Sequence, residues 1–239
     1  MALQGRRVCG LISGGKDSNY AFYKALREGA TPACILSIRP KASDSWMFHV
    51  PLVDLTRLQA KAMGLEDRHI IAEVSGVKEK EVDELEEILR EAREKWGFDT
   101  ISVGALASRY QKERIERIAE RIDVDVYAPL WMVDQEEYMR EIVREGLRFI
   151  LVKISVMGLE PDLLGKPIDE ELVEVILDRA RKYGFNPAFE GGEAETLVVD
   201  APHYKMRIEV RGKPVRKGPF EWELVVEEAR LTPKPGFIV

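Results

Sequence analysis

The chain has 239 residues, of which 45% are hydrophobic and 33% charged, enough for one large α/β domain or two smaller ones. Its formal net charge of −6 argues against a protein that holds nucleic acid directly through its phosphates. The sequence has no basic-then-apolar signal segment, and no apolar run reaches the roughly 20 residues that a membrane span needs. We therefore expect a cytoplasmic protein with no membrane contact.

The cysteines and histidines argue against a zinc site. Cys9 and Cys34 each lie in an apolar, strand-like run, which predicts buried free thiols in a reducing compartment. His49, His69 and His203 are scattered along the chain, and no Cys/His pair has the spacing of zinc ligands.

The first 128 residues alternate between short apolar runs and amphipathic segments. The predicted strands are 7–12, 33–38, 69–72, 100–103 and 124–128, and the predicted helices are 17–28, 54–63, 77–96 and 111–122. This alternation is typical of a Rossmann-like, doubly wound α/β domain with a five-stranded parallel sheet. Such sheets bind ligands beyond the carboxyl ends of their strands, so the turn at 13–15 lies where a phosphate site is expected.

From about Pro129 the pattern changes, because strands begin to follow one another directly. The predicted helices are 135–145 and 169–183, and the predicted strands are 149–156, 197–199, 206–210 and 223–228. Consecutive strands predict a second, smaller α+β domain. We therefore divide the chain into domains 1–128 and 129–239.

Residues 10–18, GLISGGKDS, come close to the Walker pattern G-x-x-x-x-G-K-[S/T], but Asp17 stands where that loop has Ser or Thr. Gly14 and Gly15 permit a close backbone approach, the following helix offers the positive end of its dipole, and Lys16 adds a charge. These features favour an anion site. The alternative is a plain strand–helix turn with Asp17 or Ser18 as the N-cap.

The string SGGKDS at 13–18 resembles the PP-motif, SGGxDS, of the ATP pyrophosphatases. This resemblance implies the five-stranded PP-loop (HUP-type) fold, in which the turn holds the pyrophosphate that leaves and ATP is cleaved between its α- and β-phosphates. Lys16 and Mg²⁺ would neutralise the charge that develops, while Asp17 would either hold the metal or brace the loop. The resemblance implies ATP-binding roles for Ser13, Gly14, Gly15, Lys16, Asp17, Ser18, Ser37, Ile38 and Gly104.

Two further stretches carry chemistry. Residues 104–117, GALASRYQKERIER, place polar groups at a helix start beyond the fourth strand, although ordinary caps and surface residues also fit. Residues 190–196, EGGEAET, gather three acids around a Gly-Gly turn, which also fits a solvated acidic loop.

Taken together, the chain resembles the diphthine–ammonia ligase group of the PP-loop ATP pyrophosphatases over nearly its full length. The matching strings are SGGKDS (13–18), SWMFH (45–49), GALASRYQKERIER (104–117), PLW (129–131), LLGK (163–166) and EGGEAET (190–196). Because it lacks the added C-terminal domains of eukaryotic members, it looks like the short archaeal form.

The resemblance implies ATP-dependent amidation of diphthine, a modified histidine of translation elongation factor 2, with ammonium as the nitrogen source and with AMP and pyrophosphate as products. Glu193 and Glu195 would join Lys16 and Asp17 as catalytic residues, contacting the trimethylammonium group of diphthine, orienting ammonium or accepting its proton. For His49 a structural role is an equal alternative. The residues expected to bind substrate are His49, Ser108, Tyr110, Gln111, Arg114, Glu190, Gly191, Gly192 and Thr196.

Two other functions remain open. A tRNA-thiolating PP-loop ligase would need a reactive thiol, so an exposed, low-pKa Cys34 would favour it. A non-catalytic ATP- or AMP-binding sensor is disfavoured by the intact 16–18 string and the acidic loop. A glutamine-fed reaction is disfavoured because no glutaminase domain is apparent, which leaves free ammonium.

Overall fold

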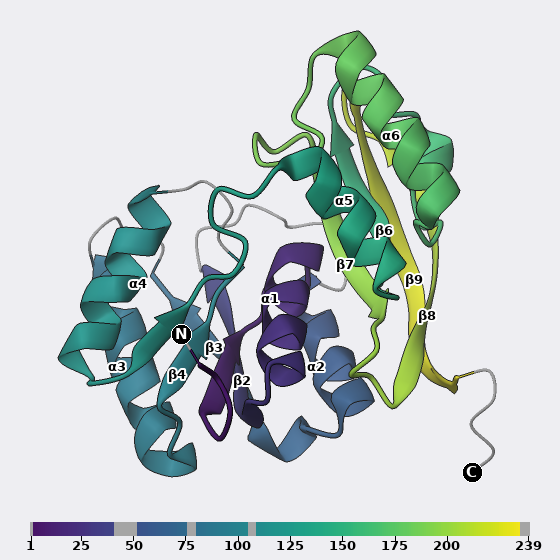
Figure 1. Ribbon diagram of the computed structural model, residues 1–239. Coiled ribbons are helices and arrows are strands. Elements are labelled where there is room, and N and C mark those ends of the chain that lie inside the picture. Colours follow the sequence, from purple (N-terminus) through teal and green to yellow (C-terminus); the bar gives the residue numbers. More distant parts are fainter. Residues whose placement is uncertain (1, 41–51, 76–79, 105–108, 235–239) are drawn as a thin grey trace. The chain divides into compact units, whose positions relative to one another are not determined.

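The computed structural model describes residues 2–40, 52–75, 80–104 and 109–234, and Figure 1 shows its ribbon. By its internal contacts the chain divides into two compact units. Unit 1 comprises residues 1–61 and 65–131, and unit 2 comprises residues 62–64 and 132–239. Each unit is described by itself below.

Unit 1 is built on a parallel sheet of five strands in the order β3-β2-β1-β4-β5. The strands are β1 (Arg7–Leu11), β2 (Thr31–Pro40), β3 (His69–Val74), β4 (Thr100–Ser102) and β5 (Asp125–Tyr127). The predicted five-stranded parallel sheet is confirmed. The chain runs outward from β1 in one direction and then returns to β4, so the strand order reverses between β1 and β4, where such sheets bind ligands.

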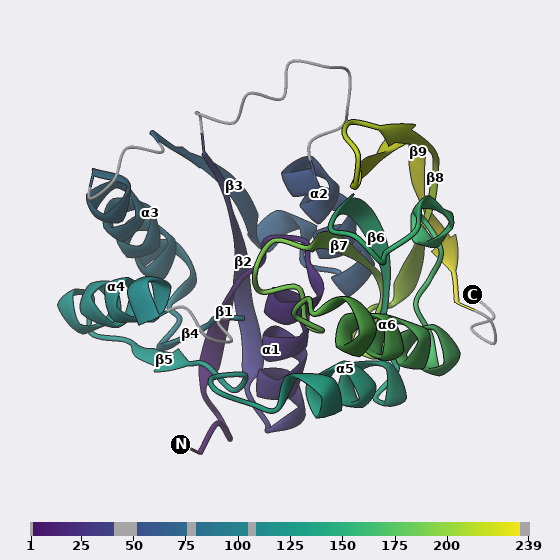
Figure 2. The ribbon, with the colours of Figure 1, turned by 90° about the horizontal axis from the view of Figure 1, so that it is seen from above.

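Helices cover both faces of this sheet. They are α1 (Lys16–Arg27), α2 (Leu52–Met63), α3 (Lys80–Trp96) and α4 (Arg109–Arg121), with a short 3-10 helix, η1 (Glu66–Arg68). Figure 2 shows α1 and α2 on one face and α3 and α4 on the other. This arrangement follows from right-handed crossovers that proceed in opposite directions from the central strand.

The core between the sheet and α3 and α4 contains both cysteines. Cys9 of β1 lies directly opposite Cys34 of β2, and both side chains are fully buried. Burial, reinforced by the neighbouring Cys34 thiol, raises the pKa of Cys9 well above its usual value. The prediction of buried free thiols is confirmed, and a thiol in this environment is a poor nucleophile.

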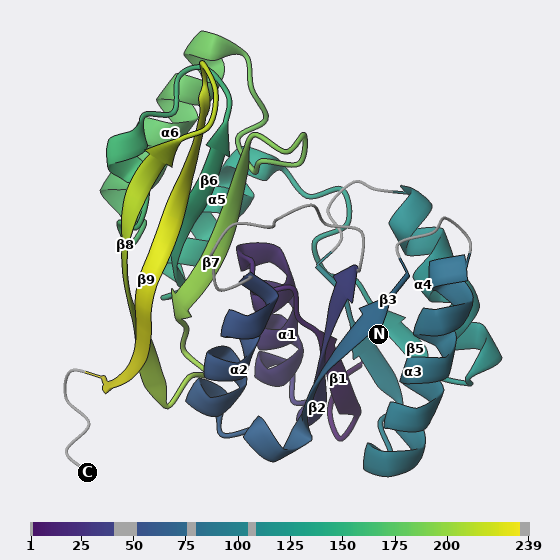
Figure 3. The same cartoon turned by 180° about the vertical axis from the view of Figure 1, so that it is seen from behind.

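Unit 2 is an antiparallel sheet of four strands in the order β7-β6-β9-β8. Its elements are α5 (Gln135–Arg144), β6 (Arg148–Ser155), η2 (Pro161–Leu163), α6 (Glu170–Tyr183), β7 (Ala194–Asp200), β8 (Met206–Arg216) and β9 (Glu221–Pro233). Figures 2 and 3 show α5 and α6 on the same face of this sheet. The predicted second unit of α+β type is confirmed.

The hairpin of β8 and β9 is much longer than the sequence pattern predicted. Its added length is rich in charges and mostly exposed, so it lacks the apolar alternation from which a strand is recognised. The charges pair across the ladder instead. Arg230 lies opposite Glu209 at 2.8 Å, and Lys213 pairs with Glu227 at 2.7 Å.

None of the helices in the described ranges combines the length and the apolar character that crossing a bilayer demands.

Two histidines are held neutral inside the units. His69 shares its Nε2 with the hydroxyls of Ser37 and Thr56 at 3.1 and 3.2 Å, which ties β3 to β2 and α2. Burial, together with the charge of Arg57, lowers the pKa of His69 to about 4. Burial, with the charge of Lys234, lowers the pKa of His203 to about 3.

We expect folding stability to fall as the pH drops from 6.5 towards 4. Because the folded-state pKa values lie below the unfolded value, the unfolded chain takes up protons first, and stability present above pH 6.5 is lost on acidification. His203, which is half-buried with both ring nitrogens out of contact with solvent, contributes at most about 1.4 kcal/mol per pH unit. Urea unfolding between pH 7 and 5.5, before most carboxylates titrate, checks this. His203→Asn should flatten the dependence, and an unchanged slope in that variant would contradict the assignment.

Candidate functional site

The turn after β1 has the geometry of an anion site. Gly14 has a φ of +98°, a conformation that favours glycine. Gly15 is the N-cap of α1, and no side chain caps this helix. The alternative reading, in which Asp17 or Ser18 caps the helix, is therefore wrong. The positive end of the α1 dipole faces the turn, where the N–H of Gly15 donates to Oγ of Ser13 at 3.4 Å.

The two serines of the motif hold the turn in shape. The backbone N–H of Ser13 donates to Oγ of Ser18 at 3.1 Å, and the two hydroxyls lie 3.1 Å apart. The Ser18 hydroxyl also donates to the carbonyl of Gly15 at 3.3 Å. Hydrogen bonds thus join Ser13 and Ser18, the first and last residues of the string, and fix the shape of the turn in the absence of a ligand.

Lys16 and Asp17 form an ion pair at the start of α1. Lys16 is 2% exposed, and its Nζ lies 2.7 Å from Oδ1 of Asp17. Burying a lysine charge is costly unless it is paired, so Asp17 keeps the ammonium in place. This ion pair does not decide between the two roles predicted for Asp17, and both stay predictions.

A magnesium ion would find few protein ligands here. In the described ranges, no three His, Cys, Asp or Glu side chains gather as a metal site. Mg²⁺ commonly binds through one or two carboxylates together with substrate phosphates. The turn therefore fits a magnesium–nucleotide complex in which phosphates supply most of the ligands and Asp17 at most one oxygen.

Two amide side chains that the sequence analysis missed secure the same turn. Nε2 of Gln59, from α2, donates to the carbonyl of Gly14 at 2.9 Å, and Nδ2 of Asn19 donates to that of Gly15 at 2.9 Å. Both residues are fully buried. Gln59 follows the buried Leu55 by four positions and so lies on the apolar stripe of its helix. A polar residue at such a position could have indicated a buried hydrogen bond.

Gly104 is required by packing against the turn. A Cβ at Gly104 would lie 2.4 Å from the backbone nitrogen of Ser18 and 2.5 Å from the carbonyl carbon of Asp17. Any other residue would push the chain after β4 away from the first turn of α1. The structure thus brings Gly104 next to the motif, as an ATP-binding role requires. Gly10, in contrast, packs against the ring of Phe22, where a Cβ would lie 2.7 Å away, as expected of a strand residue outside the motif.

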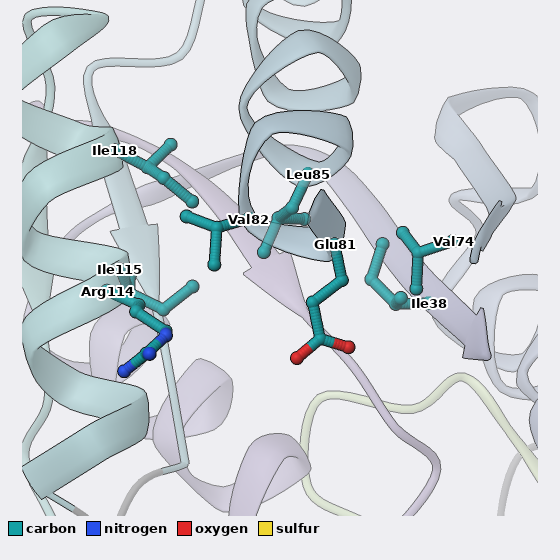
Figure 4. A pocket seen from close by; sticks show the side chains of 8 residues that line it. All are labelled: Ile38, Val74, Glu81, Val82, Leu85, Arg114, Ile115 and Ile118. Carbon is teal, nitrogen blue, oxygen red and sulfur yellow. The ribbon is translucent and has the colours of Figure 1, made fainter. Parts of the chain in front are cut away.

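The end of β2 presents two neighbouring residues to opposite sides. The hydroxyl of Ser37 is fully buried against His69, so only its backbone remains for a ligand, as the resemblance implied. Ile38, in contrast, lines a cavity of about 160 Å³ between the sheet and helices α3 and α4. Figure 4 shows this cavity, whose lining residues are Ile38, Val74, Glu81, Val82, Leu85, Arg114, Ile115 and Ile118.

The cavity is lined mainly by apolar side chains, with two charged groups at one side. Figure 4 shows aliphatic side chains from β2, β3, α3 and α4 around the hollow, while the carboxylate of Glu81 and the guanidinium of Arg114 lie at one side of it. Whole sites for drug-sized ligands measure about 300–1,000 Å³, so this space suits one flat ring system. The structure thus brings together Ile38 and Arg114, for which the resemblance implied separate roles.

Several predicted substrate residues lie outside the described part of the chain. His49 and Ser108 belong to the ranges that the structure does not describe. Tyr110 and Gln111 lie in the first turn of α4, but their side chains are not among those described.

In unit 2, the acidic motif forms a braced loop before β7. The carboxylate of Glu193 accepts hydrogen bonds from the backbone N–H groups of Asn186, at 3.0 Å, and Gly191, at 2.8 Å. Oδ1 of Asn186 in turn accepts from the N–H groups of Ala188 and Glu190. Of the three acids, Glu193 is therefore engaged in shaping the loop.

The other motif residues lie at the loop surface or at the start of the strand. Glu190, Gly191 and Gly192 are all exposed, and Gly192 has a φ of +83°, which its place in the turn requires. Glu195 is also exposed, and its Oε1 lies 3.6 Å from Nζ of Lys153 on the neighbouring strand. Thr196 is half-buried and faces Leu151 across the β6–β7 ladder.

Comparison with known proteins covers both units. Residues 6–126 match the diphthamide synthase N-terminal domain, and residues 134–229 match the diphthamide synthase C-terminal domain. The chain is similar to the diphthine–ammonia ligase of Mus musculus, with 33% identity over 224 residues, covering 85% of this chain and 82% of the mouse protein. It is similar to the ligase of Danio rerio, with 36% identity over 219 residues, covering 84% of this chain and 85% of that protein.

Two further similarities are more limited. The diphthine–ammonia ligase of Schizosaccharomyces pombe is 31% identical over 223 residues, which are 87% of this chain but 37% of the yeast protein. A solved 4-thiouridine synthetase in complex with RNA and bound ATP has a TM-score of 0.42 and 15% identity, covering 82% of this chain and 55% of its own. Because the chain spans most of the vertebrate relatives, a short chain does not distinguish archaeal from eukaryotic members, and the archaeal origin stays a prediction.

We expect Glu193→Gln to loosen the loop at 186–193 and Glu195→Gln to leave it unchanged. The amide that replaces the Glu193 carboxylate would set an N–H donor against a backbone N–H, so one of the two hydrogen bonds is lost. Losing such a bond costs about 1–3 kcal/mol, which corresponds to a rise in local exchange of about 5- to 150-fold. Hydrogen exchange of the Asn186 and Gly191 amides measures it. Equal protection in both variants would show that the Glu193 carboxylate does not brace the loop.

Proposed function

Because the chain belongs to the diphthine–ammonia ligase family, we propose that it amidates diphthine on translation elongation factor 2, using ATP and ammonium and releasing AMP and pyrophosphate. The observation that carries this proposal in the structure is the turn at 13–18, preformed at the switch point of a parallel sheet and backed by Gly104.

The chemistry requires activation of a carboxylate. A carboxylate oxygen is a poor leaving group, so an oxygen of diphthine first attacks the α-phosphorus of ATP and pyrophosphate leaves with the bridging oxygen. The nitrogen of ammonia then attacks the acyl carbon, and AMP leaves with the oxygen that came from diphthine. The product is the carboxamide, diphthamide.

The residues of unit 1 support the first step. The turn at 13–15, the α1 dipole and the ammonium of Lys16 would stabilise the charge that develops on the leaving pyrophosphate. Mg²⁺ carried by the nucleotide would add to this, and Asp17 could supply it with one carboxylate oxygen. The apolar cavity beside Ile38 lies at the carboxyl ends of β2 and β3, and we assign it to the adenine base.

The residues of unit 2 support the second step. Ammonium must lose a proton to become a nucleophile, and Glu190 and Glu195 are exposed carboxylates on the motif loop and strand. Glu193 would act by holding that loop in place. Full ligase activity in both Glu193→Gln and Glu195→Gln would show that these acids have no part in the reaction.

The alternative of tRNA thiolation is not favoured. Both cysteines are fully buried in the core of unit 1, and the pKa of Cys9 is raised, whereas a persulfide carrier needs an exposed thiolate. The family relationship also names a carbon–nitrogen ligase, which leaves a purely sensory role without support. We further propose that the reaction takes place in the cytoplasm, where elongation factor 2 acts.

An isotope experiment tests the reaction. When the diphthine carboxylate of elongation factor 2 is labelled with ¹⁸O, the AMP released should carry one labelled oxygen, and its formation should require the modified factor. Lys16→Met should slow AMP formation at least about a hundredfold, as expected from loss of one preorganised donor to the developing charge. ADP as the product, or unlabelled AMP from a labelled substrate, would contradict an acyl-adenylate.

The adenine assignment predicts a selective effect on ATP. Ile115→Trp should fill the cavity and raise the KM for ATP about tenfold or more, because the base then loses its apolar burial. The KM for the modified factor should stay within about twofold of the wild-type value, since the substitution leaves the acidic motif intact. Ile115→Leu, which conserves volume, serves as the control. An unchanged KM for ATP in a folded Ile115→Trp protein would contradict the assignment of this cavity to the adenine base.

A further inference from the structure

The sheet of unit 2 carries a row of alternating charges that begins at the acidic motif. Glu195 on β7 lies directly opposite Lys153 on β6, and Lys153 lies directly opposite Glu223 on β9. Residues opposite one another in an antiparallel ladder project from the same face. The sequence motif supplied only Glu195, and its partner Lys153 comes from a strand with no motif of its own.

Lys153 lies between two carboxylates without being held tightly by either. Its Nζ is 3.6 Å from Oε1 of Glu195 and 3.7 Å from Oε1 of Glu221. Charge-assisted hydrogen bonds measure about 2.7–2.9 Å, so both contacts are ion pairs of the loose kind. The side chains are 35% exposed for Lys153, 53% for Glu195 and 44% for Glu221. Solvent, and hence a ligand, reaches all three.

The order of charges fits a ligand that carries both signs. A trimethylammonium group has no N–H to donate and is attracted by carboxylate charge, whereas a carboxylate needs a donor cation. Glu195 and Glu221 offer the first kind of contact and Lys153 the second. Loose pairs between exposed charges contribute about 0–1 kcal/mol each, so exchanging them for a ligand costs little.

We propose that Lys153 binds the carboxylate of diphthine while Glu195 and Glu221 bind its trimethylammonium group. This inference rests on the proposed function for the identity of the substrate. It makes Lys153 a substrate-binding residue and gives Glu195 a role in recognition of the cation.

Kinetics with the full-length chain test the proposal. Lys153→Met should raise the KM for the modified elongation factor at least about tenfold, as loss of a hydrogen bond to a charged group would, and leave the KM for ATP unchanged. Lys153→Arg keeps the charge and should recover most of the loss. Lys213→Met is the matched control, because it breaks another exposed ion pair of the same sheet, with Glu227. Thermal unfolding confirms that each variant is folded.

A second measurement is independent of the reaction. Trimethylglycine, which carries a trimethylammonium group and a carboxylate on one carbon, is titrated into the labelled protein and followed by NMR. Shifts centred on residues 153, 195 and 221 that vanish in Lys153→Met support the proposal. If Lys153→Met behaves like Lys213→Met in both KM and titration, the proposal is overturned. Absence of AMP formation by the wild-type chain would instead overturn the proposed function, while leaving the titration to decide on the charge row.

Discussion

The close backbone approach between Gly104 and the first turn of α1 is the constraint on which the proposed ATP site depends. The chain leaving β4 comes so near Ser18 that a Cβ at position 104 would lie 2.4 Å from its backbone nitrogen. Because β1 and β4 are neighbours in the sheet, this contact fixes the two strand ends beside the strand-order reversal. The turn at 13–18 is therefore fixed by the backbone at Gly104, which packs against it, and by the hydrogen bonds between Ser13 and Ser18.

The polar groups beneath the turn show how rigidity is achieved. Gln59 and Asn19 satisfy the carbonyls of Gly14 and Gly15, so those carbonyls point away from the space where an anion would lie. Each amide is buried and would be costly to leave unpaired, so the hydrogen bonds that stabilise unit 1 also shape the turn. A preorganised site of this kind needs no rearrangement when charge develops on a leaving group.

Among the described residues, the sequence predicted each α-helix and each strand, because buried strands and amphipathic helices leave strong apolar patterns. It did not predict the 3-10 helices η1 and η2, which are too short to carry such a pattern. It also did not predict the full length of the β8–β9 hairpin. The added residues are mostly exposed and are held by cross-strand ion pairs, such as Arg230 with Glu209, rather than by buried apolar side chains. In the site, the motif residues were visible as strings. Gln59 and Lys153 could not be recognised, because each lies far in sequence from the motif residue that it contacts. A single polar residue also forms no pattern that a motif could match.

Within the acidic motif, we assign loop shape to Glu193 and substrate recognition to Glu195, and the backbone explains this division. Ser155 donates its N–H to the carbonyl of Glu193, so the β6–β7 pairing already begins at that residue. Yet the Glu193 side chain turns back onto the loop, where it accepts the N–H groups of Asn186 and of Gly191 in the Gly-Gly turn. Two residues on, Glu195 projects from the strand to Lys153. Because the Glu193 carboxylate already accepts two backbone N–H groups, we assign the contact with the ligand to Glu195.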